Sequence, residues 1–328
     1  MKEYGVAPAI IQALAMALVM VSACGGTTPT AEVPEPEPLR FDGSLLSLAP
    51  RAARLVVHGS PRTLWASSGF RQVIDPLFPP DRLQAFGDRT GVRIAELREA
   101  LYADLGEGRF LIACRAESAP DVVRAAGMRM NTIEVSADAP VMRRTGFLGA
   151  ERRELAAVGD DLLLVGADAS AEIAAILRGI RTELPEPALT GPDGASLRQA
   201  FNAPLVVYAP QPLDLPDDSP IGLILAQERA AAIAVQPLDD ALDVRARVIG
   251  ELPATAEENF RRFLAALSES DLGRILGINQ ALASLEIQMA PDLADLRSQW
   301  PVGQLSRAIR VLFVDELQAL LEEPVFAE

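Results

Sequence analysis

Residues 242–248 alternate strictly between apolar and charged side chains, and this pattern restricts the fold more than any other in the chain. The apolar positions are Leu242, Val244, Ala246 and Val248, and the charged positions between them are Asp243, Arg245 and Arg247. Successive side chains of a β-strand point to opposite faces, so the segment predicts a strand with one buried and one polar face. Such strands are typical of antiparallel sheets covered on one side. We therefore expect an α+β fold of mostly antiparallel sheets with helices packed on one face.

The same order of elements recurs in the two halves of the chain. In the first half, a hairpin is predicted around an Asp-rich turn at 159–161, followed by a helix over 173–180. In the second half, paired strands around 239–240 precede a helix that begins at a capping box formed by Thr255 and Glu258. The repeated order predicts two related units.

The predicted units are separated by a segment rich in helix-breaking residues. This segment, E-L-P-E-P-A-L-T-G-P-D-G, spans residues 183–194, and its helix breakers lie within Pro185–Gly194. We accordingly expect a first α+β unit over 41–184, a linker over 185–194 and a second α+β unit over 195–328. Each unit has a common domain size.

Spacing of apolar residues predicts several further elements. A later strand is expected where Leu285, Ile287 and Met289 alternate with Glu286 and Gln288. Helix faces are expected at three sets of positions: Phe70, Val73, Ile74 and Leu77; Leu97, Leu101 and Leu105; and Leu305, Ile309, Leu312, Leu317 and Leu320. Trp65 and Trp300 fall in predicted helical stretches, where packing is their expected role.

The first two dozen residues are organised as an export segment. Lys2 opens a short charged start, residues 9–21 are nearly all apolar, and Val21-Ser22-Ala23-Cys24 closes the segment. The apolar run is short for a permanent membrane span, which needs about 20 apolar residues. The closing residues resemble the lipobox of bacterial lipoproteins, in which signal peptidase II cleaves before a cysteine that has received a diacylglyceryl thioether. This resemblance implies a signal peptide over 1–23 and Cys24 as the lipidated mature N-terminus.

Residues 24–40 are predicted to be a disordered, lipid-anchored tether. Proline and glutamate alternate there, which favours extended chain and mutual repulsion over a packed core. Gly25 follows the cysteine, where the lipoprotein family often has an aspartate that favours retention in the inner membrane. The resemblance thus implies the outer membrane. We expect the periplasmic face, and the cell exterior remains an alternative.

Composition excludes several classes of function. The net charge of −15 opposes binding of nucleic acid, which depends on clustered Lys and Arg. Beyond Lys2 the chain has no lysine, so it lacks the lysine of a P-loop and of Schiff-base or pyridoxal chemistry. One histidine and two cysteines do not suggest a zinc site. We expect no cofactor and no bound metal.

Three further features of the sequence are candidate sites. His58 lies between a predicted strand and a helix starting at Ser60-Pro61, but neither a nucleophile nor an orienting acid is evident for a triad. Cys114 falls in an apolar run typical of a buried strand, where a thiol is usually inert. Asp214, Asp217 and Asp218 form an acidic loop that offers oxygen ligands for calcium, but they do not have EF-hand spacing, and turn formation by aspartate is the preferred explanation.

These features favour a lipid-anchored protein of the cell envelope with a non-catalytic binding or structural role and an envelope protein as partner. One alternative is a carrier of small apolar ligands in the periplasm, which requires a large enclosed apolar cavity. The other is a hydrolase that uses carboxylates or His58, which requires those groups to converge at one cleft with shifted pKa values. The oligomeric state is left open.

Overall fold

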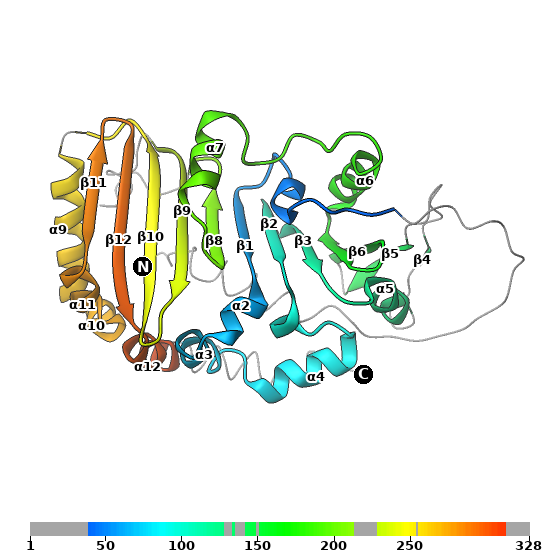
Figure 1. The fold of residues 1–328 in the computed structure, drawn as a ribbon, viewed down its shortest axis with the longest axis horizontal. Helices are drawn as coiled ribbons and strands as arrows, with labels where there is room; N and C mark the ends of the chain where they lie inside the picture. The colour runs from blue at the N-terminus through cyan, green and yellow to red at the C-terminus, as the bar shows by residue number, and fades with distance from the viewer. Residues whose placement is uncertain are drawn as a thin grey trace, which may run out of the picture. The chain divides into compact units, whose positions relative to one another are not determined.

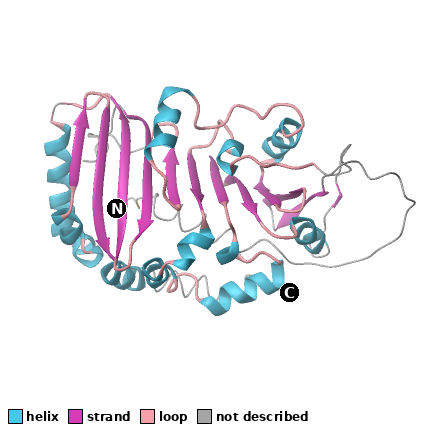
Figure 2. Cartoon of the chain, in the orientation of Figure 1, coloured by secondary structure: helices cyan, strands magenta, loops and turns pink. Residues whose placement is uncertain are grey.

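The computed structural model describes residues 39–127, 133–134, 142–148, 151–212, 228–253 and 255–312. The chain divides into two compact units, each containing strands and helices (Figure 2). Among the described residues, the first unit comprises those up to Pro50 and Asp81–Pro185, and the second comprises Arg51–Pro80 and those from Glu186 onward. Two details differ from the predicted boundaries. Residues 51–80 belong to the second unit, and the predicted linker over 185–194 contains the start of a helix.

The first unit contains an antiparallel sheet with strand order β2-β3-β7-β6-β5-β4 (Figure 1). Its strands are β2 (Ala100–Gly106), β3 (Arg109–Arg115), β4 (Ile133–Glu134), β5 (Met142–Leu148), β6 (Glu151–Val158) and β7 (Leu162–Ala167). Its helices are η1 (Leu45–Leu48), α4 (Pro80–Thr90), η2 (Ile94–Glu96), α5 (Ala119–Gly127) and α6 (Ser170–Gly179).

The hairpin predicted around residues 159–161 is confirmed. Strands β6 and β7 pair in register from Val158 opposite Leu162 to Arg153 opposite Ala167. Gly159 occupies the left-handed region with φ of 58°, which a residue without Cβ adopts at little cost. All six residues of β7 are buried, and helix α6 follows as predicted.

The predicted helix with Leu97, Leu101 and Leu105 is wrong. Leu97 follows the short helix η2, whereas Leu101 and Leu105 belong to strand β2. A spacing of four residues places side chains on one face of either a helix or a strand, and Ala103 between the two leucines is also fully buried. Apolar residues at positions 101, 103 and 105 therefore repeat every two residues, which is the pattern of a strand.

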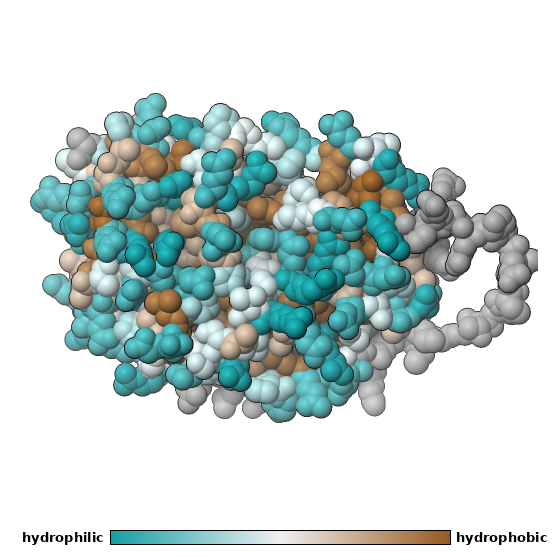
Figure 3. Space-filling model, in the orientation of Figure 1, coloured by the Kyte–Doolittle hydropathy of each residue, from teal (hydrophilic) through white to brown (hydrophobic). Residues whose placement is uncertain are grey.

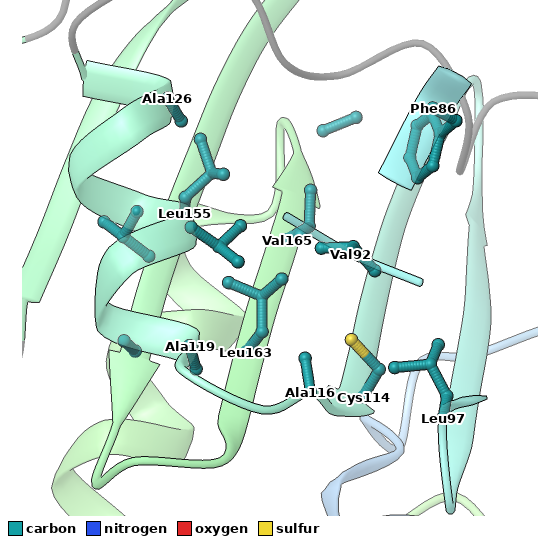
Figure 4. Packing of buried hydrophobic residues seen from close by; sticks show 14 of the residues in the cluster. Phe86, Val92, Leu97, Cys114, Ala116, Ala119, Ala126, Leu155, Leu163 and Val165 are labelled. Atoms are coloured by element: carbon teal, nitrogen blue, oxygen red, sulfur yellow. The ribbon is translucent and has the colours of Figure 1, made fainter. Parts of the chain in front are cut away.

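The core of the first unit lies between the sheet and α5 (Figure 4). Ala119 and Ala126 of α5 lie beside Leu155, Leu163 and Val165 of the sheet. Small alanines on the helix allow its backbone to approach the branched strand residues closely, as dense core packing requires.

The second unit contains an antiparallel sheet with strand order β11-β12-β10-β9-β8-β1 (Figure 1). Its strands are β1 (Leu55–Gly59), β8 (Leu205–Ala209), β9 (Glu228–Pro237), β10 (Ala241–Gly250), β11 (Glu286–Ala290) and β12 (Leu293–Pro301). Its helices are α2 (Pro61–Ala66), α3 (Ser68–Ile74), α7 (Gly191–Ala200), α9 (Ala256–Glu269), α10 (Asp271–Leu276), α11 (Ile278–Ala283) and α12 (Val302–Leu312). Residues 51–80 join this unit because β1 pairs with β8, with Val56 opposite Tyr208.

The alternation at 242–248 is confirmed in β10. Leu242 and Val244 pack with Val73 of α3 and Val302 of α12, while the adjacent strands β12 and β11 bury Leu296, Ile287 and Met289 against Phe260 of α9. The predicted strand around Ile287 is likewise confirmed as β11. Trp300 was placed in a helix by the sequence but lies in β12, where it faces the same core.

Two predicted helix starts are correct, but their predicted side-chain caps do not form. Thr255 precedes α9 without capping it; its hydroxyl accepts a hydrogen bond from Asn259, and Glu258 pairs with Arg262. Ser60 precedes Pro61 of α2, and its hydroxyl lies 2.9 Å from that of Thr63 rather than capping a helix amide.

Helices cover both faces of each sheet, which corrects the prediction of helices on one face only. In the first unit α5 packs over Leu155 and Val165. Ile173 of α6 lies against Gly166, which follows Val165 in β7 and therefore faces the other side of the sheet. In the second unit α7 crosses the polar face, where Ser196 accepts a hydrogen bond from Arg247. In the second unit a polar strand face is therefore partly covered by a helix that accepts a hydrogen bond from one of its arginines.

Candidate functional site

Charged and amide side chains line one face of strands β10, β12 and β11 in the second unit. Arg297 of β12 lies opposite Arg245 of β10 on one side and Glu286 of β11 on the other. Asp295 likewise lies between Arg247 and Gln288. Cross-strand partners share a face, so these rows form one polar surface. We define the arginine–carboxylate face as Asp243, Arg245, Arg247, Glu286, Gln288, Asp295 and Arg297.

Asp243 is the centre of this face. Its Oδ2 accepts hydrogen bonds from Nε and Nη2 of Arg245 at 2.9 and 2.7 Å, and its Oδ1 accepts one from Nε of Arg297 at 2.9 Å. The Asp243 side chain is 2% exposed, whereas Arg245 and Arg297 are 47% and 46% exposed. Two guanidinium groups on neighbouring strands would repel each other, and the buried carboxylate between them removes that repulsion.

The protonation of Asp243 follows from these contacts. Burial by itself would raise the pKa of Asp243, but the hydrogen bonds and charges of Arg297 and Arg245 outweigh burial and lower the pKa below its ordinary value. The carboxylate is therefore ionised at neutral pH. Asp243 accordingly does not resemble a general acid, whose pKa is raised toward the working pH.

A second ion pair extends the face toward α7. Arg247 donates from Nε and Nη2 to the two carboxylate oxygens of Asp295, both at 2.7 Å. This bidentate contact raises the pKa of Arg247, and its Nη1 also reaches the Ser196 carbonyl and hydroxyl at 3.4 Å. The pair thus connects the sheet to the helix that lies over it.

A groove of about 280 Å³ lies over the arginine–carboxylate face beside the end of α7. The three arginines, Glu286, Gln288 and Asp295 line it, and Ala200 and Phe201 form its apolar side. Figure 1 shows β10, β12 and β11 in open view on the face that α7 crosses nearby. Hydrophilic residues, in teal, are spread over this face in Figure 3.

A second polar cavity of about 330 Å³ lies at the start of α7. It is lined by Arg51, Thr190, Gln211 and the ion pair between Asp193 and Arg229. The hydrogen bond from Arg229 lowers the pKa of Asp193. Neither this cavity nor the groove has the enclosed apolar lining that a carrier of apolar ligands requires.

His58 lies half-buried in β1 opposite Val206, directly before the turn into α2. The predicted strand-to-helix corner is confirmed. The structure places His58 on a different strand from the arginine–carboxylate face, separated from β10 by β8 and β9.

Cys114 is buried in β3 within the core of the first unit, as predicted (Figure 4). Burial raises the pKa of the Cys114 thiol to about 12, so the reactive thiolate is scarce at neutral pH.

We expect Cys114 to resist alkylation in the folded protein. In a Cys24→Ser variant, whose single remaining thiol is Cys114, iodoacetamide should react at neutral pH at least about 100-fold more slowly than after unfolding in urea. The measurement is mass spectrometry over time. Equal rates with and without urea would contradict the burial of this side chain.

The acidic turns have other roles or lie outside the described residues. Asp161 pairs with Arg98 and Arg115, and Asp239 and Asp240 occupy the exposed turn between β9 and β10. The calcium candidates Asp214, Asp217 and Asp218 lie outside the described residues, as does Cys24. Within the described ranges, no group of three or more His, Cys, Asp or Glu side chains is arranged to hold a metal ion.

The sequence contained only part of the signal for the arginine–carboxylate face. It placed Asp243, Arg245 and Arg247 on the polar side of one strand, but this pattern alone did not mark a site. Arg297 and Asp295 come from a strand about 50 residues later, and only the register of β10 with β12 brings them to Asp243 and Arg247.

Among the described helices, none is long and apolar enough to cross a membrane.

Comparison with known proteins gives a weak similarity to solved structures alone. No protein-family model matches the chain, and no curated protein matches it. Crystal form III of TP0453 is 10% identical with a TM-score of 0.48, covering 81% of this chain and 98% of that one. Form IV gives 9% identity, a TM-score of 0.47 and coverage of 80% and 95%. Form I gives 11% identity, a TM-score of 0.45 and coverage of 81% of this chain and 96% of that one. Values this low say nothing of what the present chain binds.

Proposed function

We propose that this chain is a lipid-anchored protein of the cell envelope that binds another envelope protein through the arginine–carboxylate face. The anchor is Cys24 at the outer membrane, and the proposed role is non-catalytic. The observation that supports the binding role most is the buried Asp243 holding two half-exposed arginines on a sheet face that α7 covers only in part. Arginine is enriched in protein interfaces, and fixing its side chain beforehand reduces the entropy lost on binding.

The polar rows also suit recognition more than stability. Charges arranged in a fixed pattern discriminate between partners, because a mismatched partner brings like charges together or leaves charges unpaired. Surface ion pairs by themselves add about 0–1 kcal/mol to stability. A face with several exposed charged groups is therefore better explained by a partner than by folding alone.

Site-specific photocrosslinking in cells tests this proposal. A photoreactive residue at position 288 lies on the face, and one at position 280 lies on α11, on the other side of the sheet; both glutamines are exposed. We expect one discrete crosslinked product from position 288, its loss when Arg297→Gln is added, and no such product from position 280.

Two outcomes would reject the proposal. One is the absence of a product from position 288 in protein that is present at its normal level. The other is a product that forms equally from positions 288 and 280, because contact would then not depend on this face.

A further inference from the structure

The guanidinium groups at the centre of the groove have donors that Asp243 does not use. Arg245 and Arg297 each bind Asp243 through Nε and Nη2. Arginine has five N–H donors, two of them on Nη1. Within the described part of the chain, Nη1 of neither residue has a hydrogen-bond partner. These donors remain for a ligand.

The exposure of the three side chains determines the charge that a ligand meets. Asp243 lies beneath the surface, whereas close to half of each arginine is accessible. The three groups together have a net charge of +1, which exposed Glu286 on the Arg297 side of the groove offsets. An incoming group therefore contacts guanidinium edges before it approaches the carboxylate. Planar guanidinium edges match carboxylate oxygens in both geometry and charge.

The remaining charges of the groove narrow the choice of ligand. Arg247 and Asp295 neutralise each other through their bidentate contact. Glu286 lies directly across from Arg297, whose pKa is raised mainly by its hydrogen bond to Asp243 and to a smaller extent by the charge of Glu286. Arg245 has no such exposed acidic neighbour opposite it, because its partner on β9 is Ala234. The pair of arginines is thus open to an anion mainly on the Arg245 side.

We propose that this groove binds a carboxylate-bearing peptide segment, with Arg245 and Arg297 as its donors and Glu286 as a competitor for Arg297. The inference rests on the proposed function, since it names the chemistry of the partner at that face. The groove's volume of about 280 Å³ accommodates side chains of a short acidic segment, and Phe201 offers an apolar contact beside them.

The test measures binding of dye-labelled octaglutamate to the full chain by fluorescence anisotropy at low ionic strength. Arg245→Gln and Arg297→Gln should each weaken binding about tenfold, because each removes a charged donor. Glu286→Gln should tighten binding about threefold and leaves the Asp243 contacts intact, so this variant tests the inference even if an arginine variant folds poorly. A neutral Gly-Ser peptide of equal length should not bind.

Arg261→Gln is the matched control. Arg261 is an arginine of the same unit, 50% exposed and paired with Glu257 on α9, so its replacement changes the net charge equally. It should change octaglutamate binding by less than about twofold if the groove is the site, because an exposed charge elsewhere acts only through the screened long-range field. Equal weakening by Arg261→Gln and Arg297→Gln would overturn the inference.

Failure of octaglutamate to bind the unmodified chain, or weaker binding after Glu286→Gln, would also overturn it. These results are distinct from failure of the proposed function. A discrete crosslink from position 288 without octaglutamate binding would mean that the face contacts a partner of another chemistry. Octaglutamate binding without that crosslink would support the groove and reject the cellular role.

Discussion

Replacing Cys24 with serine is expected to move the protein from the membrane fraction to the soluble fraction. The expectation follows from the lipobox resemblance, because a serine hydroxyl receives no thioether-linked lipid. Each buried methylene of an acyl chain contributes about 0.8 kcal/mol, so losing all chains removes far more than a mixed-charge surface restores. The acidic chain, at −15, has little attraction for anionic lipid that would retain it. Fractionation followed by immunoblotting measures the change.

Cys114→Ala provides the control for that substitution. It also removes a cysteine, but one that is buried in β3, and it leaves Cys24 available. The Cys114→Ala protein should remain in the membrane fraction, and its N-terminal peptide should have the mass of a lipidated cysteine. Membrane retention of the Cys24→Ser protein after a high-salt wash would contradict the predicted anchor.

The second large effect is expected from Asp243→Asn. We expect the free energy of unfolding of the second unit to fall by about 2–4 kcal/mol, since the change leaves two arginines opposed without a negative charge. Removing one partner of a fully buried pair costs about 3–5 kcal/mol, and the exposure of both arginines reduces this figure. Urea unfolding followed by tryptophan fluorescence reports this unit, because both Trp65 and Trp300 belong to it.

Asp295→Asn is the control for Asp243→Asn. Asp295 is also bound by an arginine, but its side chain is 34% exposed, so its loss should cost about 1 kcal/mol or less. Equal effects of the two substitutions would show that Asp243 is not specially important to this face.

The pH dependence provides a second check on Asp243. Because the folded-state pKa is lowered, the stabilisation is fully present above the unfolded-state pKa of about 3.9 and is lost as pH falls through the folded value. The stability difference between the unmodified protein and Asp243→Asn should therefore be constant from neutral pH down to about 4 and narrow below it. A difference that grew in acid would contradict this sign.

Local patterns predicted the elements whose side chains repeat clearly. The alternation in β10, the turn at Gly159 and the buried run containing Cys114 each depend on neighbouring residues, and all three are confirmed. The helix predicted from Leu101 and Leu105 is wrong because a spacing of four residues fits both a helix and a strand. Where a pattern fits two periods, only packing selects between them.

Long-range pairing was the part that the sequence did not supply. Nothing local indicates that β1 pairs with β8 about 150 residues later, so residues 51–80 were placed in the wrong unit. The same limit applies to the site, since Asp243 is visible as a polar strand residue but its contact with Arg297 depends on strand order and register. The covering of the polar face of β10 by α7 was not predicted, because a half-polar strand suggests that its polar face is open to solvent.

The strict alternation of β10 also constrains how this protein can change length during evolution. Inserting or deleting one residue within the strand would turn Arg245 and Arg247 toward α12 and bring Val244 to the surface. Insertions and deletions among descendants of this chain should consequently occur in the turn at Asp239-Asp240 and in the segment between β10 and α9. Changes of length there do not shift the register of the strands.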